Sequence, residues 1–300
     1  MTSGTGSTTP PAPTSDASGL ADQIRRRLGD CSPAERKVGR ALLAAFPSAG
    51  FETVAALAAR AGVSGPTVVR FVGRLGFTGF PDFQAALRAD LDDRSASPLA
   101  LYETRRVAEA TGADEALARY APAAVDSVRR TFAEMPPSDF TRTVAILARE
   151  ARRVHVVGGR FSRLVAMYLV QHLQQMRPRV DYLSERPEGR SHTLTDLSAR
   201  DALVVFDYRR YEQDSARLAQ FAATRNATVV LFTDAWLSPI ASLSTAVLPS
   251  STGTASAYDA MSPAMALVEA VVSGVLAELG EDAHRRMQRI EQTGTTLDIY

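Results

Sequence analysis

The 300-residue chain contains few of the residues that build disulfides, metal sites and proton-transfer sites. Cys31 is its single cysteine, which excludes an internal disulfide, argues against a cysteine-based metal site and favours a reducing compartment. Its four histidines are scattered, and no cluster of His, Cys, Asp or Glu shows metal-ligand spacing. We therefore predict neither a metal ion nor a cofactor.

The chain also lacks a long apolar run and a strong net charge. The best candidate for a membrane span, residues 264–276, is short and carries Glu269. Residues 1–19 are rich in Ser, Thr, Pro and Gly and lack the apolar segment of a signal peptide, which predicts a disordered tail. A net charge of +1 excludes a global attraction to nucleic acid, so any basic surface has to be local. These absences predict a cytoplasmic protein without a membrane partner.

The most informative segment that is present has the spacing of two short helices. Apolar residues from Val54 to Ala61 recur at intervals of three and four, which is typical of an amphipathic helix. Gly62 follows, at a position where leaving a helix usually needs a positive φ. Ser64 can cap a second helix, with Pro66 in its first turn. This spacing indicates a helix-turn-helix, although an ordinary helical hairpin has the same pattern.

The second helix is predicted to present a polar face to double-stranded DNA. The apolar positions expected to face inward are Val68, Phe71, Val72 and Leu75. Thr67, Arg70 and Arg74 are expected to face outward, and with Ser64 at the helix N-terminus they are the candidate DNA contacts. No acidic residue lies between positions 52 and 82, and residues 20–94 hold eleven basic against eight acidic residues. This local excess suits a surface that neutralises phosphates.

The length and the pattern predict two folded domains joined by helices. The predicted divisions are a tail at 1–19, a DNA-binding domain at 20–94, a helical linker at 95–137, an α/β domain at 138–281 and a C-terminal helix with tail at 282–300. A polar stretch at 92–98 marks the first boundary, and the linker helix is predicted to break at Pro122 and to stop at Pro136.

From Ser138 onward, helices and apolar strands alternate. The predicted strands are 153–158, 180–183, 202–206, 227–233 and 245–248, and the predicted helices are 139–150, 162–176, 211–224 and 261–279. Continuous apolar strands between helices are typical of a parallel sheet covered on both faces. The fold class is therefore α/β overall, an all-α head followed by a doubly wound parallel sheet, and ligands are expected at the carboxyl ends of its strands.

Residues 32–91 resemble the helix-turn-helix of the RpiR/MurR-type bacterial transcription regulators. The motifs that carry the resemblance are Ala61-Gly62-Val63-Ser64, Thr67-Val68-Val69-Arg70-Phe71 and Arg74-Leu75-Gly76-Phe77. Members of that family carry a C-terminal sugar isomerase (SIS) domain that senses sugar phosphates, and residues 139–280 resemble that flavodoxin-like domain. The resemblance implies a regulator that binds operator DNA as a homodimer or homotetramer and responds to a sugar phosphate or another anionic metabolite.

Two motifs of the SIS domain are present and a third is absent. Residues 158–162, GGRFS, resemble its G-x-G-x-S loop with Arg160 in place of the second glycine, and residues 233–241 resemble its T-x-x-x-x-S-P-(L/I)-A stretch. Where the family has S-x-S-G-x-T, this chain reads DYRRYE, so that Asp207, Arg209 and Glu212 replace the three hydroxyls. The resemblance makes the candidate ligand-binding residues Gly158, Arg160, Ser162, Arg209, Arg210 and Ser238.

The missing hydroxyl loop leaves the ligand open. Asp207 and Glu212 would repel a phosphate, whereas Arg209 and Arg210 could donate charge-assisted hydrogen bonds to an anion. The pocket could hold a phosphosugar through the arginines, hold a different ligand, or hold none, and the two arginines could equally be a solvated pair. Ser162 either binds the ligand or only caps its helix. Trp236 either lines the pocket or packs against a neighbouring helix.

Catalytic chemistry is thinly represented. Sugar isomerisation needs a base near the substrate. His155 lies in a predicted buried strand, and His192, in a predicted loop, is the one histidine expected to reach a pocket. The main hypothesis is a DNA-binding regulator that is not an enzyme, and the alternative is a phosphosugar isomerase with a helical appendage.

Overall fold

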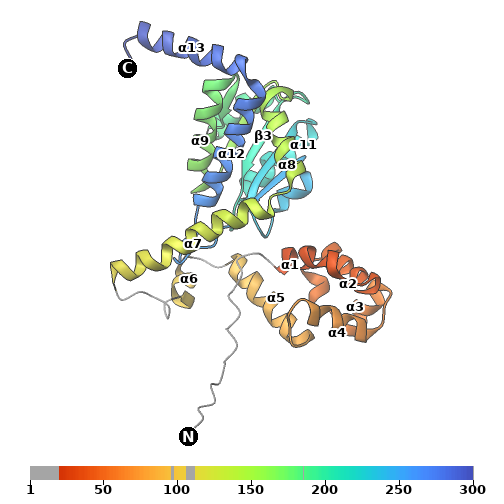
Figure 1. Ribbon diagram of the computed structural model, residues 1–300. Helices are drawn as coiled ribbons and strands as arrows, with labels where there is room; N and C mark the ends of the chain where they lie inside the picture. The colour runs from red at the N-terminus through yellow and green to blue at the C-terminus, as the bar shows by residue number, and fades with distance from the viewer. Residues whose placement is uncertain (1–19, 96–97, 106–111, 185, 300) are drawn as a thin grey trace.

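The computed structural model describes residues 20–95, 98–105, 112–184 and 186–299, and the predicted tail at 1–19 lies outside them. The chain forms a small helical head and a larger sheet domain, with a long helix between them (Figure 1). The helices of the head are α1 (Leu20–Arg27), α2 (Pro33–Ala44), α3 (Val54–Ala61), α4 (Gly65–Arg74) and α5 (Phe80–Ser95), with short 3-10 turns η1 (Leu28–Asp30) and η2 (Ser48–Phe51).

Local sequence signals set the helix ends of the head. The predicted capping box at the start of α2 is confirmed, because the Ser32 amide donates to Glu35 Oε2 at 2.9 Å and the Glu35 amide donates to the Ser32 hydroxyl at 3.4 Å. Gly62 ends α3 with a φ of 62°, the left-handed conformation expected there. Phe71 of α4 and Phe83 of α5 are fully buried in the core that these helices share.

The segment between the domains differs from its prediction. Helix α5 continues through the polar stretch to Ser95, α6 spans Pro98–Arg105, and α7 runs unbroken from Ala113 to Glu134. The predicted break at Pro122 is therefore wrong. Proline removes one backbone donor, and tertiary contacts of the same helix offset that loss, since Ser127 is buried and donates to the carbonyl of Gly253 at 2.6 Å. The predicted stop before Pro136 agrees with the end of α7.

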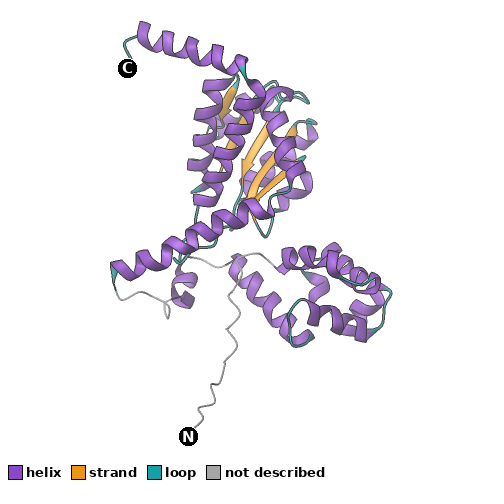
Figure 2. Cartoon of the chain, viewed as in Figure 1, coloured by secondary structure: helices purple, strands orange, loops and turns teal. Residues whose placement is uncertain are grey.

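The sheet domain has five parallel strands in the order β2-β1-β3-β4-β5. Figure 2 shows the strands in orange among the purple helices of this domain. The strands are β1 (Val154–Gly158), β2 (Val180–Tyr182), β3 (Ala202–Phe206), β4 (Thr228–Asp234) and β5 (Ala246–Ser250). The predicted doubly wound α/β class is confirmed. The order reverses between β1 and β3, which makes the carboxyl ends of these two strands the switch point of the sheet.

Helices cover both faces of the sheet. The domain's helices are α8 (Pro137–Ala145), α9 (Ser162–Met176), α10 (Pro187–Thr195), α11 (Gln213–Thr224), α12 (Ser262–Leu279) and α13 (Glu281–Thr296), with a π turn η4 (Ile146–Glu150) and a 3-10 turn η5 (Pro239–Leu243). One face packs against α8, α9 and α12, and the other packs against α10, α11 and η5. Successive residues of β3, such as Val204 and Val205, point to opposite faces, and both are fully buried.

One predicted loop is a helix. Residues 187–195 form α10, whose Leu194 is buried against the sheet. Helix α12 agrees with the helix predicted at 261–279, and by length and composition it is the one helix in the described part of the chain that could cross a membrane. Its apolar character has a local cause, because Leu267, Val268 and Val271 are fully buried in the core of the domain.

Candidate DNA-binding and effector sites

Helix α4 presents one exposed stripe that begins near its N-terminus. Its exposed positions, spaced three and four apart, are Pro66, Val69, Arg70, Gly73 and Arg74. The opposite face, with Val68, Phe71 and Val72, is fully buried in the head core, as predicted. The stripe carries two guanidinium groups and one apolar side chain, which are groups that contact phosphates and base edges.

The structure corrects the prediction for Thr67. This residue is only 5% exposed, so it does not lie on the outward face. Its hydroxyl lies 2.9 Å from that of Ser64 and accepts a hydrogen bond of 3.2 Å from Arg70. Ser64 occupies the N-cap position and is exposed, but its side chain makes no capping bond to the backbone, because it bonds Thr67 instead. Thr67 therefore orients Arg70 from the buried side.

Two further arginines of the head form ion pairs within the chain, and one further side chain of α4 is exposed. Arg74 forms an ion pair of 3.3 Å with Glu35, which is buried and whose pKa is lowered mainly by the hydrogen bond from the backbone of Ser32. Arg60, on α3, is paired with Glu52. Val69, which is 46% exposed, was not among the predicted contacts. The helical spacing places Val69 on the same stripe as Arg70. The sequence prediction selected polar side chains only, so it missed this apolar candidate contact.

The second candidate site lies at the switch point between β1 and β3. Residues 158–161 lead from β1 into α9, and residues 207–212 lead from β3 into α11. Ser162 is buried, and its hydroxyl accepts from the Gly159 amide at 2.9 Å and donates to the Phe206 carbonyl at 2.8 Å. The prediction that Ser162 only caps its helix is wrong, since Phe161 is the N-cap residue and the Ser162 hydroxyl joins the two loops. A Cβ at Gly158 would lie 2.7 Å from the Arg163 backbone, so glycine is required there.

Asp207 forms the buried centre of the 207–212 loop. Its Oδ1 accepts from the Glu212 amide at 3.1 Å, and its Oδ2 accepts from the Ser238 hydroxyl. Burial raises the pKa of the Asp207 carboxyl, and the hydrogen bond from Ser238 offsets part of that rise in pKa. Ser238 is itself buried and caps the turn η5 through the Ile240 amide at 3.2 Å. The predicted ligand residue Ser238 thus lies beneath the loop and holds Asp207.

Arg209 and Arg210, which were both predicted as anion contacts, occupy different environments. The Arg209 side chain is only 3% exposed, is paired with Asp259 and lies over the Trp236 ring, with 5.5 Å from its guanidinium carbon to the ring centroid. Arg210 is exposed and has a φ of 69°. It stands at the glycine position of the S-x-S-G-x-T pattern, so the backbone keeps a left-handed conformation that glycine adopts more easily.

Glu212 reaches across to the other loop. Its Oε1 accepts from the Arg160 amide at 3.0 Å, and a Cβ at Gly159 would lie 2.7 Å from the same oxygen. Arg160 is exposed, with its guanidinium over the Phe161 ring. Glu212 was predicted to repel a phosphate, and the structure adds that its carboxylate touches the loop in front of α9.

Comparisons with known proteins agree with this architecture. Residues 18–94 match the helix-turn-helix domain of the rpiR family, and residues 147–274 match the SIS domain. The chain belongs to the RpiR-type transcriptional regulators. It is 28% identical to the HTH-type transcriptional regulator HexR of Pseudomonas aeruginosa over 284 residues, which cover 91% of this chain and 95% of the relative. It is 28% identical to HexR of Escherichia coli over 223 residues, which cover 72% of each chain.

Two solved structures share the fold of this RpiR-type regulator. The NanR protein of Vibrio vulnificus, solved in complex with ManNAc-6P, has a TM-score of 0.53 and 24% identity, and the match covers 93% of this chain and 98% of that one. The sugar isomerase domain of an RpiR transcription factor from Sphaerobacter thermophilus has a TM-score of 0.53 and 23% identity over 56% of this chain and 94% of that one. The SIS assignment predicted from the sequence motifs is confirmed by the family match to residues 147–274.

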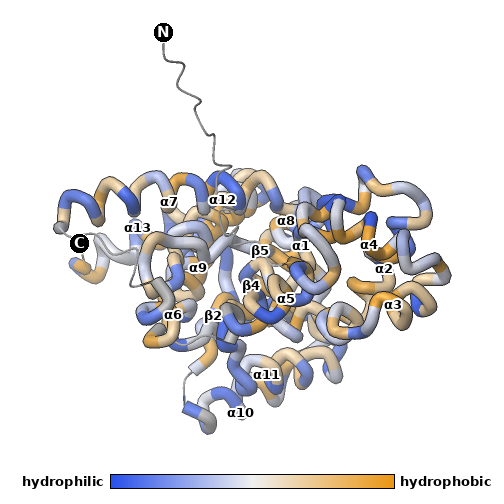
Figure 3. Tube along the Cα trace, turned by 90° about the horizontal axis from the view of Figure 1, so that it is seen from below, coloured by the Kyte–Doolittle hydropathy of each residue, from blue (hydrophilic) through white to orange (hydrophobic). Residues whose placement is uncertain are grey.

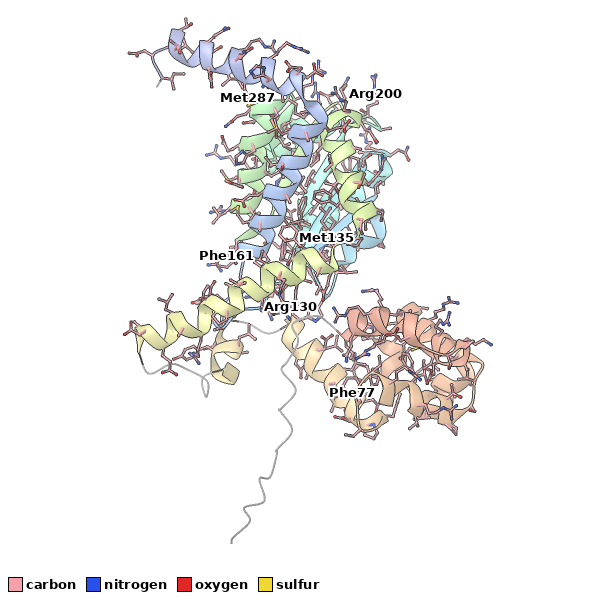
Figure 4. All side chains as sticks on the ribbon, in the orientation of Figure 1. Phe77, Arg130, Met135, Phe161, Arg200 and Met287 are labelled. Atoms are coloured by element: carbon pink, nitrogen blue, oxygen red, sulfur yellow. The ribbon has the colours of Figure 1, made fainter. Side chains whose placement is uncertain are left out.

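In this regulator the head lies against the carboxyl edge of the SIS sheet. Viewed from below, α1 and α5 are the head helices nearest to β4 and β5 (Figure 3). Trp236, just after β4, donates from its indole nitrogen to Asp90 of α5 at 2.8 Å. It therefore lies against a neighbouring helix, as one of its two predicted roles has it, and this helix belongs to the head; it also contacts Arg209. A cavity of about 470 Å³ at the junction is lined by Arg25, Arg26 and Arg130 together with residues of β5 and residues that follow β4, and Figure 4 labels Arg130 there.

The two histidines considered as catalytic bases, His155 and His192, lie in different environments. His155 is buried in β1, and burial lowers the pKa of its imidazole. His192 lies on α10 and is exposed, so the predicted loop position is wrong, because residues 187–195 pack Leu194 into the core.

Proposed function

We propose that the exposed stripe of α4 reads double-stranded operator DNA, and that a small sugar-derived metabolite at the carboxyl edge of the SIS sheet changes the affinity of the head for that DNA. The observation that supports the first part is the arrangement of Val69, Arg70 and Arg74 on one exposed face of a helix whose other face is wholly buried. A guanidinium at the position of Arg70 suits bidentate contact with a guanine edge, and Arg74 suits a phosphate.

The DNA part is tested with an operator obtained from a randomised duplex pool enriched on the wild-type protein. Arg70→Ala should weaken binding to that operator by about 1–3 kcal/mol and relax the base preference at one position. Arg217→Ala, an exposed arginine on α11, is the matched control and should bind as the wild type does. An equal loss on operator and random duplex would reassign Arg70 to phosphate contact, and no loss on either would refute the assignment of α4.

The effector part rests on the switch-point loops, on the Trp236–Asp90 bond and on the family to which the chain belongs. The candidate ligand residues in these loops are Gly158, Arg160, Ser162, Arg209, Arg210 and Ser238. Because a ligand that alters DNA affinity must itself bind more tightly or weakly when DNA is bound, by the same factor, both affinities are measured. If saturating ligand leaves the affinity for the operator unchanged, the SIS domain serves only in assembly of the oligomer.

We further propose that the regulator acts in the cytoplasm as a homodimer or homotetramer on two-fold related half-sites. Support comes from exposed apolar side chains on α7 and α9, which a second copy would cover. These are Leu117, Tyr120 and Val125 on α7, Leu164 and Met167 on α9, and Phe161 at the N-cap of α9. Sedimentation equilibrium gives the stoichiometry, and a monomer at all concentrations would refute this proposal.

We propose that the SIS domain is not an isomerase. The support is that His155 is buried away from any substrate, while the exposed His192 has no second acid–base group assigned to it. Turnover of hexose and pentose phosphates by the purified protein tests this. Turnover that disappears in His192→Ala would establish the alternative, an isomerase with a helical appendage.

A further inference from the structure

Two helices of the SIS domain begin at the same point, the switch between β1 and β3. Helix α9 has 15 residues and starts after the loop 158–161, and α11 has 12 residues and starts after the loop 207–212. The first amides of such helices carry partial positive charge and bind anions. In a sheet of this strand order, the crevice at the switch point is also where ligands bind.

Both helix starts already hold carboxylates of the chain itself. Asp207 accepts from the amide of Glu212, the N-cap residue of α11, at 3.1 Å. The side chain of Glu212 in turn accepts from the amide of Arg160, in front of α9, at 3.0 Å. Glu212 Oε1 lies so close to the loop that a Cβ at Gly159 would be 2.7 Å away. The two carboxylates thus occupy the positions that an external anion would take.

The positive side chains of the 207–212 loop do not reverse this charge balance at the α9 loop. The Arg209 guanidinium is turned toward Asp259 and the Trp236 ring and is almost fully buried there. Arg210 is exposed, at the turn of the loop. A phosphate that enters between the loops would have to bind the Arg160 amide, to which the Glu212 carboxylate is already hydrogen-bonded. The two negative charges would then lie close together and repel each other.

We propose that Glu212 is the specificity-determining residue of this crevice: its carboxylate is a built-in substitute for a phosphate group, so the effector presents an uncharged or cationic group to the α9 loop. This rests on the proposed effector function and narrows its ligand to polyhydroxylated molecules without a phosphate at that position. Glu212 is exposed, so a ligand can reach it from solvent and donate hydroxyl or ammonium protons to its second oxygen.

The test is to remove the carboxylate and look for phosphate binding. Glu212→Ser places at the N-cap of α11 a residue that favours this position, so the variant is expected to fold. Isothermal titration with inorganic phosphate and with glucose 6-phosphate should show binding to Glu212→Ser that is at least about tenfold tighter than to the wild type, a difference of about 1.4 kcal/mol. Glucose, the uncharged partner, should show no such gain.

A control variant at a remote carboxylate distinguishes the effect of Glu212 on phosphate binding from the effect of the change in net charge. Glu291→Ser, at an exposed position of α13, removes the same charge and should bind phosphate as weakly as the wild type. Glu212→Gln keeps an oxygen near the Arg160 amide without the charge, and an intermediate gain is expected. Equal phosphate affinity in the wild type and both Glu212 variants would overturn the proposal. Because these readouts measure ligand binding without DNA, they are independent of whether the regulator couples ligand to operator.

Discussion

The indole nitrogen of Trp236 donates a 2.8 Å hydrogen bond to Asp90, and this bond joins the end of β4 in the SIS domain to α5 in the head. The same Asp90 oxygen accepts from the Leu20 amide at the start of α1 at 3.3 Å. Trp236 also lies under the Arg209 guanidinium. A displacement of the 207–212 loop by a ligand therefore has a direct path of contacts to the DNA-binding head.

Replacing Asp90 should be visible in the fluorescence of Trp236, the single tryptophan of the chain. Asp90→Ala removes the acceptor of the indole N–H and admits water to a half-buried ring, so the emission maximum should shift to longer wavelength and quenching by acrylamide should increase. Asp92→Ala, two residues farther along α5, is the control and should leave the spectrum unchanged. Identical spectra for wild type and Asp90→Ala would mean that the domains do not make this contact in solution.

The two adjacent arginines of the switch-point loop should respond differently to truncation. Arg209→Ala leaves Asp259 without its partner and uncovers the Trp236 ring, so the free energy of unfolding should fall by about 1–3 kcal/mol. Arg210→Ala changes an exposed side chain and should stay within about 0.5 kcal/mol of the wild type. Denaturant titration measures both values. Equal losses would contradict the burial of Arg209 in its pair.

Val69 is expected to read a thymine methyl group in the operator. Its exposed side chain lies on the same stripe of α4 as Arg70, and apolar contact with that methyl is a direct form of readout. Replacing single thymines by uracil should reveal one position at which the wild type loses about 1 kcal/mol of binding. Val69→Ala should bind the thymine and uracil duplexes equally at that position, while sensitivity elsewhere remains. A Val69→Ala protein with an unchanged uracil profile would exclude this contact.

Burial of His155 makes stability depend on pH. The lowered pKa of the folded imidazole, caused mainly by desolvation, lies below the ordinary value of 6.5, so between these two values the unfolded chain binds a proton that the folded chain does not. The free energy of unfolding should therefore fall as pH drops below about 6.5 and level off above it. His155→Phe should flatten this part of the profile relative to the wild type. Unfolding free energies measured from pH 5 to 8 in both proteins test the expectation, and parallel profiles would contradict it.

Signals that act over a few residues were predicted correctly. The capping box of Ser32 and Glu35, the left-handed Gly62 and the helix at Ser162–Met176 each depend on neighbours within one or two turns, and each is found at the predicted place. The strand at Ala202–Phe206 agrees as well, because a continuous apolar run has few alternatives inside a sheet covered on both faces.

Errors arose where distant contacts outweighed a local preference. Pro122 does not break α7, since the helix is held by buried contacts at Ser127 and Thr131. Residues 187–195 looked like loop and form a helix because Leu194 packs on the sheet. Thr67 was predicted to face outward because it is polar. It is buried instead, because its side chain is small and its hydroxyl forms a hydrogen bond with Arg70.

The two-domain order, the helix-turn-helix, the parallel sheet and the absence of the hydroxyl loop could be predicted from the residues alone, because each is encoded in periodicity or in a contiguous motif. The roles of the substituted residues follow from the folded arrangement. It turned Arg209 inward to Asp259, fitted Glu212 against the loop before α9 and connected Trp236 to Asp90. Those outcomes depend on contacts between residues 50 to 146 positions apart, for which the local pattern carries no information.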